Sequence, residues 1–150
     1  MLHMVENKLR SITINSLVDV PGGKTKRWSE KLRPQDQMHI VALEHFIGVE
    51  KGGWSDNGHI LSRNPVNPWN EWKDRATGME PTGTEGYFGY CGRDYYAEVG
   101  GIPDVNTYEA FPAGCHFLIE RGEALFMHCY ASNFKDKQIA FHHAVRILFW

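Results

Sequence analysis

The C-terminal run from 139 to 150 is the feature that most constrains the fold of this chain. One set of alternating positions holds Ile139, Phe141, His143, Val145, Ile147 and Phe149; the other holds Ala140, His142, Ala144, Arg146, Leu148 and Trp150. Successive side chains of a β-strand point to opposite faces, so a mainly apolar set with this period of two indicates a strand with one buried face. The run is therefore predicted to be a core strand.

Shorter runs rich in aromatic and β-branched residues precede it, separated by Gly, Pro or Asn: Glu85–Tyr90, Asp94–Val99, Cys115–Arg121 and Ala124–Ala131. Such runs are typical of strands. About seven short strands at regular spacing favour an all-β, single-domain antiparallel β-sandwich, with a barrel second. The chain of 150 residues has the size of one domain.

The opening of the chain is predicted to be a hairpin. Lys8–Val18 alternates, Pro21-Gly22-Gly23 interrupts it, and Lys24–Leu32 follows as a more polar strand. A second tight hairpin is predicted at Arg121-Gly122-Glu123.

The segment Asp36–Glu50 fits two structures. Its apolar residues recur at helical spacing behind a potential Asp36 cap, yet they also alternate as in a strand. A helix here would favour the alternative fold, a cone-shaped α+β barrel. In that fold His39, His128 or His143 would line the pocket of a small enzyme that uses His with Asp or Glu.

A long turn-rich loop is predicted over about 52–84, and it contains Trp54, Trp69 and Trp72. Loops of this length inside one domain are uncommon and are usually functional. Tyr95, Tyr96 and Tyr108 add aromatic rings outside the most apolar runs. We predict that these six residues form an exposed ligand-binding surface. The alternative that the tryptophans pin the loop onto the sandwich remains open.

The chemistry of these rings narrows the ligand classes. Aromatic side chains with a polar edge suit a membrane interface, stack on sugars, and attract a choline ammonium through cation–π contacts. A net charge of -2 argues against a chain-wide grip on nucleic acid.

The eight histidines and three cysteines form no recognisable metal or catalytic motif. Adjacent His142 and His143 are predicted to lie on opposite strand faces, with His143 a hydrogen-bonded core residue. His39 and His45 are predicted to share a face about 20 Å apart, too far for joint ligation. We expect no metal, cofactor or catalysis, leaving open a metal site assembled from distant residues. Cys91, Cys115 and Cys129 are expected to be buried thiols, and one disulfide between two of them is left open as the alternative.

One segment resembles a known family. Pro81–Tyr90 contains Thr-Gly-Thr-Glu-Gly at 82–86, which is similar to the strand-entry segment of aegerolysins, small leaderless β-sandwiches with an actinoporin-like fold. Phe117–Tyr130 followed by Ile139–Ile147 resembles the closing strands of that family. The chain departs from the family in Cys91-Gly92-Arg93, which follows the motif, and in Gly100–Asp104, which replaces a Trp-rich proline segment.

The resemblance implies a non-enzymatic protein that binds the head group of a membrane sphingolipid. Aegerolysin-like proteins often act beside a perforin-like partner that forms the pore, and some such pairs are insecticidal toxins. A carbohydrate-binding lectin is the first alternative. The N-terminus shows no signal-peptide core, and no apolar run approaches the ~20 residues of a membrane span. We therefore expect a cytoplasmic protein, or one secreted without a cleaved signal peptide, that is peripheral on target membranes.

Overall fold

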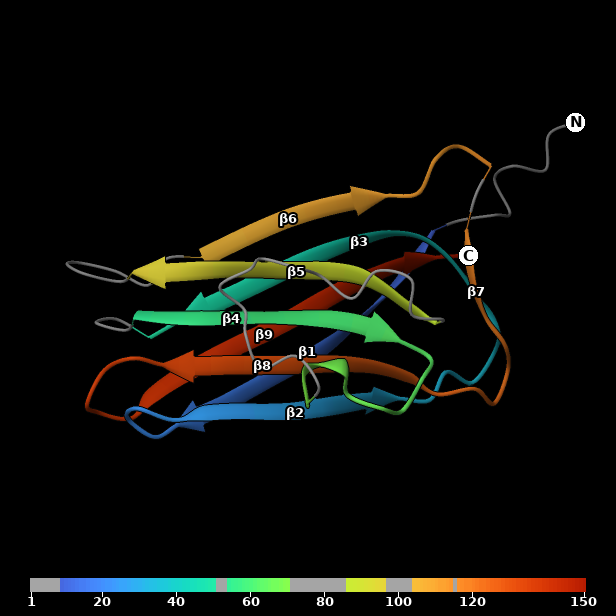
Figure 1. Ribbon diagram of the computed structural model, residues 1–150. Coiled ribbons are helices and arrows are strands. Elements are labelled where there is room, and N and C mark those ends of the chain that lie inside the picture. Colours follow the sequence, from blue (N-terminus) through green and yellow to red (C-terminus); the bar gives the residue numbers. More distant parts are fainter. Residues whose placement is uncertain (1–8, 51–53, 71–85, 97–103, 115) are drawn as a thin grey trace, which may run out of the picture.

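The computed structural model describes residues 9–50, 54–70, 86–96, 104–114 and 116–150. The described chain forms two antiparallel sheets packed face to face, so the predicted β-sandwich is confirmed (Figure 1). Its strands are β1 (Arg10–Val20), β2 (Thr25–Leu32), β3 (Met38–Val49), β4 (Trp54–Ser62), β5 (Tyr87–Tyr96), β6 (Asp104–Ala110), β7 (Phe117–Ile119), β8 (Leu125–Asn133) and β9 (Ile139–Phe149). A short 3-10 turn, η2 (Pro68–Asn70), lies between β4 and β5. Within this described part, no helix is long and apolar enough to cross a membrane.

The two sheets have different strand orders. Sheet A runs β1-β9-β3-β6, with the short β7 also paired to β3, and sheet B runs β2-β8-β4-β5. Figure 1 shows sheet B in front of sheet A. The C-terminal run is β9, which lies between β1 and β3. Its buried positions alternate as predicted, because one side faces sheet B and the other faces outwards.

The core lies between the sheets, where apolar side chains of both inner faces meet. Its main cluster contains Met38, Ile40, Leu43, Leu61, Leu125, Met127, Val145 and Ile147, and a second cluster lies towards the β1–β2 turn. Burying each such side chain contributes about 1.5–3 kcal/mol of transfer free energy. The segment Asp36–Glu50 supplies part of this core as the strand β3, which resolves the choice between helix and strand.

The prediction of two hairpins is wrong, because the strands on either side of each turn do not pair with each other. β1 pairs with β9 in sheet A, whereas β2 pairs with β8 in sheet B, so the turn at 21–24 joins the two sheets. The turn at Gly122 adopts φ +87° as expected, but it joins β7 of sheet A to β8 of sheet B. In each case the strands flanking the turn belong to different sheets.

Part of the predicted long loop is the strand β4. The sequence Asp56-Asn57-Gly58 has the composition of a turn, yet it lies in a strand paired on both sides, with β8 and with β5. The side chain of its buried Asn57 is half satisfied: Nδ2 donates a hydrogen bond of 2.8 Å to Ser55 Oγ, whereas Oδ1 has no hydrogen-bond partner among the described residues. Downstream, two predicted strands are the single strand β5, and β6 was not predicted.

Candidate functional site

Trp69 is not the exposed ring that the sequence suggested. Its side chain is fully buried, and Nε1 donates a hydrogen bond of 2.9 Å to the carbonyl oxygen of His128. The ring packs on Tyr130, with centroids 4.6 Å apart, and belongs to a small cluster with Ile60. Trp69 therefore holds the segment after β4 against sheet B. This matches the alternative in which the tryptophans anchor the loop to the sandwich.

Three of the other predicted aromatic residues lie at one end of sheet B. Backbone pairing places Trp54, at the start of β4, opposite Tyr96, at the end of β5, and Ser55 opposite Tyr95. Phe134, which follows β8 at the same end, is 56% exposed. The side chains of the predicted residues Trp54, Tyr95 and Tyr96, and the whole of Trp72, lie outside the described residues.

Tyr108 lies on the outer face of sheet A and is 63% exposed. Tyr108 is the last residue of a row that crosses the four main strands of sheet A. In this row Thr13 lies opposite Arg146, Arg146 opposite Glu44, and Glu44 opposite Tyr108. The neighbouring row places the small Ala144 opposite Phe46. A short side chain beside longer ones leaves a depression in the face.

This depression is a solvent-open hollow of about 270 Å³, which we call the outer hollow. It is lined by Thr13, Glu44, His45, Phe46, Thr107, Tyr108, Ala144 and Arg146. Arg146 Nη1 donates to Glu44 Oε1 at 3.1 Å, and both side chains are about half exposed. The outer hollow thus presents a cation and an anion side by side, next to the aromatic rings of Phe46 and Tyr108.

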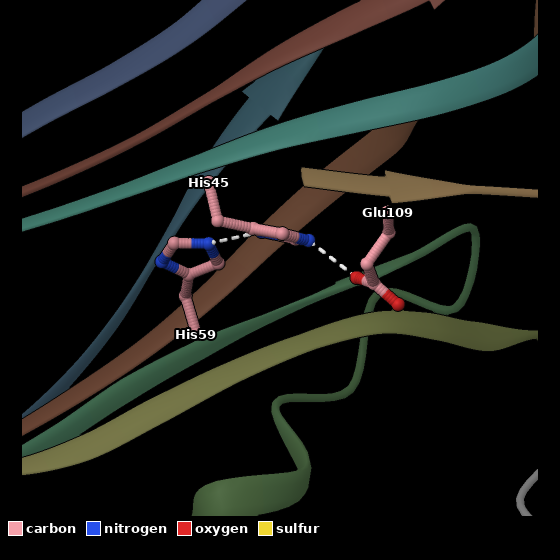
Figure 2. Close-up of polar contacts among 3 residues, drawn as sticks. All are labelled: His45, His59 and Glu109. Carbon is pink, nitrogen blue, oxygen red and sulfur yellow. Dashed lines mark hydrogen bonds and ion pairs between the residues drawn. The ribbon is translucent and has the colours of Figure 1, made fainter. Parts of the chain in front are cut away.

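A second arrangement of polar groups lies inside the sandwich. His45 Nδ1 is 2.9 Å from His59 Nε2, and His59 Nδ1 is 3.0 Å from His143 Nδ1. At the other end, His45 Nε2 is 2.5 Å from Glu109 Oε1. Figure 2 shows His45 between His59 and Glu109. We call His143, His59, His45 and Glu109 the histidine chain; its three imidazoles are buried and Glu109 is 46% exposed.

Two β-bulges direct the side chains of His45 and Cys91 into the space between the sheets. In β3 the register shifts between Ile40 and Ala42, so that Ile40 and then Leu43 and His45 face inwards. In β5, Phe88 pairs with Leu61 but Cys91 pairs with His59, so β5 has one extra residue. Gly89 has φ +69° there, a conformation that favours glycine at a bulge. Without these bulges, strict alternation would turn His45 outwards and place Tyr90 beside His59.

The first bulge corrects one prediction about the histidines. His39 and His45 do not share a face: His39 stacks on Trp150 at 4.6 Å, and His45 points between the sheets. The predictions for the β9 pair are confirmed. His143 is a buried, hydrogen-bonded core residue, and His142 contacts Asn15 on the outer face.

The protonation of the histidine chain follows from the burial of its imidazoles and from the number of protons that they carry. Burial lowers the pKa of His59 well below its ordinary value, and the neighbouring His143 and His45 lower it further. Burial, with a smaller contribution from His142, lowers the pKa of His143 to about 3. With one proton on each imidazole, the three contacts use all three protons. None is left for His143 Nε2, a buried atom without a hydrogen-bond partner among the described residues.

Cys91 lies beside this chain. One ligand atom from each of His45, His59 and Cys91 falls within 4.8 Å of the other two, and all three residues are buried. Cys129 is also a buried thiol, as predicted, and burial with the nearby Glu30 raises its pKa. Cys115 lies outside the described residues.

The sequence singles out Tyr108 for its aromatic ring but not the residues around it in the outer hollow. Arg146 belongs to the alternating run 139–150, and Glu44 and Phe46 lie in the segment Asp36–Glu50 that fits both a helix and a strand, so nothing in the local sequence marks the three as neighbours. His59 was missed because it follows the turn-like Asp56-Asn57-Gly58 in a region predicted to be a loop. Comparison with models of known protein families and with curated proteins finds no match for this sequence.

Proposed function

We propose that this protein binds the head group of a membrane sphingolipid in the outer hollow of sheet A. The observation that carries the proposal is the row of Tyr108, Glu44 and Arg146, with the ring of Phe46 beside it. A phosphocholine-type head group carries an ammonium next to a phosphate. The outer hollow offers complementary partners for both charges.

The chemistry of each partner is specific. A quaternary ammonium is attracted to the face of an aromatic ring and to a carboxylate, which Tyr108 and Glu44 provide. A phosphate accepts paired hydrogen bonds from a guanidinium, which Arg146 provides. Both charged side chains are about half exposed, and among the described residues their ion pair of 3.1 Å is with each other. A ligand can therefore reach them without unfolding a buried network.

The size of the outer hollow fits a head group and not a whole lipid. Its volume of about 270 Å³ lies just below the usual range of pockets for drug-sized ligands. The acyl chains would stay in the bilayer, with the protein peripheral on the membrane. In this proposal the chain is the recognition component beside a perforin-like partner, as the resemblance to aegerolysins implies.

Sedimentation with liposomes tests the proposal. Wild-type protein should sediment with vesicles that contain sphingomyelin, and Tyr108→Ala or Arg146→Gln should weaken binding about tenfold or more. Tyr108→Phe keeps the ring and should retain most of the affinity. Val66→Ala is the matched control, because Val66 is exposed on a loop and both of its hydrogen bonds, from its N–H to Asn64 Oδ1 and from Tyr87 to its carbonyl, use backbone atoms.

Three results would contradict the proposal. No binding to any sphingolipid-containing vesicle, with or without a pore-forming partner, removes lipid recognition. If Tyr108→Ala binds vesicles as tightly as the wild type and Trp54→Ala does not bind, the recognition site lies at the end of sheet B that holds Trp54. Binding of soluble glycans that carry no lipid, lost in Tyr108→Ala, replaces lipid recognition by lectin activity at the same hollow.

A further inference from the structure

We propose that His45, His59 and Cys91 bind one divalent transition-metal ion of the Zn²⁺ class between the two sheets. The three residues come from three strands, β3, β4 and β5, and belong to both sheets. Their ligand atoms lie within 4.8 Å of one another in the buried interior. His45 also lines the outer hollow, whereas His59 and Cys91 do not.

The spacing of the two imidazoles already approaches that of a metal site. Two nitrogen ligands on one tetrahedral Zn²⁺ are about 3.3 Å apart, given Zn–N bonds of about 2.0–2.1 Å. His45 Nδ1 and His59 Nε2 are 2.9 Å apart and share one proton. An ion in place of that proton needs only a small separation of the rings and a turn of the Cys91 thiol towards them.

The donor set selects the kind of ion. Two imidazole nitrogens and one thiolate are soft or borderline ligands, whereas Mg²⁺ and Ca²⁺ require mostly oxygen ligands. Cys91 is paired directly with His59 across β4 and β5, and the extra residue at Gly89 is what directs it there. β-bulges often occur next to functional sites, where they redirect a side chain, and this bulge directs a thiol towards two histidines.

Glu109 acts as a positioning residue for His45. Its carboxylate contacts Nε2, on the opposite side of the imidazole ring from Nδ1, so it orients the ring and is not itself a ligand. Metal-binding histidines usually donate their second N–H to a carboxylate in this way. His143 holds the second nitrogen of His59 at 3.0 Å and has the same effect on that ligand.

The bonds and protons balance. Binding forms two nitrogen–metal bonds and one sulfur–metal bond and breaks the S–H bond of Cys91, whose proton passes to the solvent. The proton between His45 and His59 moves to His59 Nδ1. The proton of His143 then moves from Nδ1 to its Nε2. Each imidazole remains neutral, so one ion releases one proton.

Titration of the reduced, chelator-treated full chain with Co²⁺ and then Zn²⁺ tests the proposal. We expect one equivalent of Co²⁺ to bind with a thiolate-to-cobalt absorption band that Zn²⁺ abolishes. Cys91→Ser should lose the band and bind Zn²⁺ at least tenfold more weakly. Cys129→Ser removes a second buried thiol of the same core and should keep both properties. No ion bound by the folded wild type, or loss of the band only in Cys129→Ser, overturns the proposal.

Two further measurements do not depend on how Cys91→Ser folds. Calorimetry of the wild type in two buffers of different ionisation enthalpy should give one proton released per Zn²⁺; release of none overturns thiolate ligation. Glu109→Gln should weaken Zn²⁺ binding about 10- to 100-fold. Glu120→Gln, an exposed acidic residue elsewhere, should leave it unchanged. Equal affinities of Glu109→Gln and wild type overturn the positioning of His45.

Discussion

Trp28 of sheet B meets His143 of sheet A edge to face, with ring centroids 5.6 Å apart and ring planes at 84°. Trp28 Nε1 donates a hydrogen bond of 2.8 Å to Ser16 Oγ, and Ser16 in turn donates to Glu30 at 2.6 Å. The tryptophan therefore covers the inner end of the histidine chain while its own N–H is satisfied. This cover explains why His143 is kept neutral far from water.

The first prediction concerns pH. An unfolded histidine titrates near pH 6.5, whereas the pKa of folded His143 is about 3. Between these values the unfolded chain binds more protons, so the free energy of unfolding is fully retained above about pH 6.5 and falls as the pH drops towards 3. The loss from His143 alone should be about 2 kcal/mol at pH 5. His59 adds to it in the same direction.

Urea denaturation at pH 7 and pH 5, with chelator present, measures this loss. His143→Leu should be less sensitive to acid than the wild type, because one buried group that resists protonation is gone. An equal decline in the two proteins would assign the acid sensitivity to other groups.

The second prediction separates folding from ligand binding at Trp69. Truncating a fully buried tryptophan costs about 3–5 kcal/mol, so Trp69→Ala should lower the urea midpoint strongly. Trp69→Phe keeps most of the packing and should bind vesicles as well as the wild type does. A folded Trp69→Phe that no longer sedimented with vesicles would return this residue to the ligand-binding surface.

How much of this the sequence could reveal depends on whether the signal is local. The strand β9 was predictable, since its alternation lies in consecutive residues. The strand β4 was not, because Asp56-Asn57-Gly58 favours a turn locally and only pairing on both sides holds it extended. Hairpin pairing failed for a similar reason: the turn residues do not specify whether the next strand continues the same sheet or crosses to the other.

The two candidate sites also depend on features of the fold that are not local in the sequence. Tyr108 could be selected from its polar surroundings, but the outer hollow depends on the register that sets Ala144 opposite Phe46. His45 and Cys91 reach the interior only through bulges in β3 and β5. A bulge changes which face every later residue occupies, so strict alternation assigns such residues to the wrong side.

The third prediction concerns the Glu44–Arg146 pair. An exposed ion pair of this kind contributes about 0–1 kcal/mol to folding. Glu44→Gln and Arg146→Gln should therefore leave the urea midpoint nearly unchanged while weakening binding to sphingomyelin vesicles. A large loss of stability in either variant would mean that the pair is structural, and reduced binding would then say nothing about the head group.

The fourth prediction tests the bulge in β5 with a pair of glycines. Gly89 and Gly23 have nearly the same φ, +69° and +71°, so replacement by alanine imposes similar backbone strain on each, about 1–2 kcal/mol. They differ in their surroundings. A Cβ on Gly89 would lie 2.7 Å from Leu43 Cδ1, whereas one on Gly23 would meet nothing within 4 Å.

Gly89→Ala should therefore lower the urea midpoint more than Gly23→Ala, because Leu43 or the bulge must shift in addition to the strain. A shift of the bulge also moves Cys91, which pairs with His59 two residues further on. Under the metal proposal, Gly89→Ala should weaken Co²⁺ binding and reduce the thiolate band, while Gly23→Ala leaves both unchanged. Co²⁺ titration of the two variants, compared at temperatures where both are folded, decides the matter. Equal Co²⁺ affinities with unequal stabilities would show that the bulge serves packing alone.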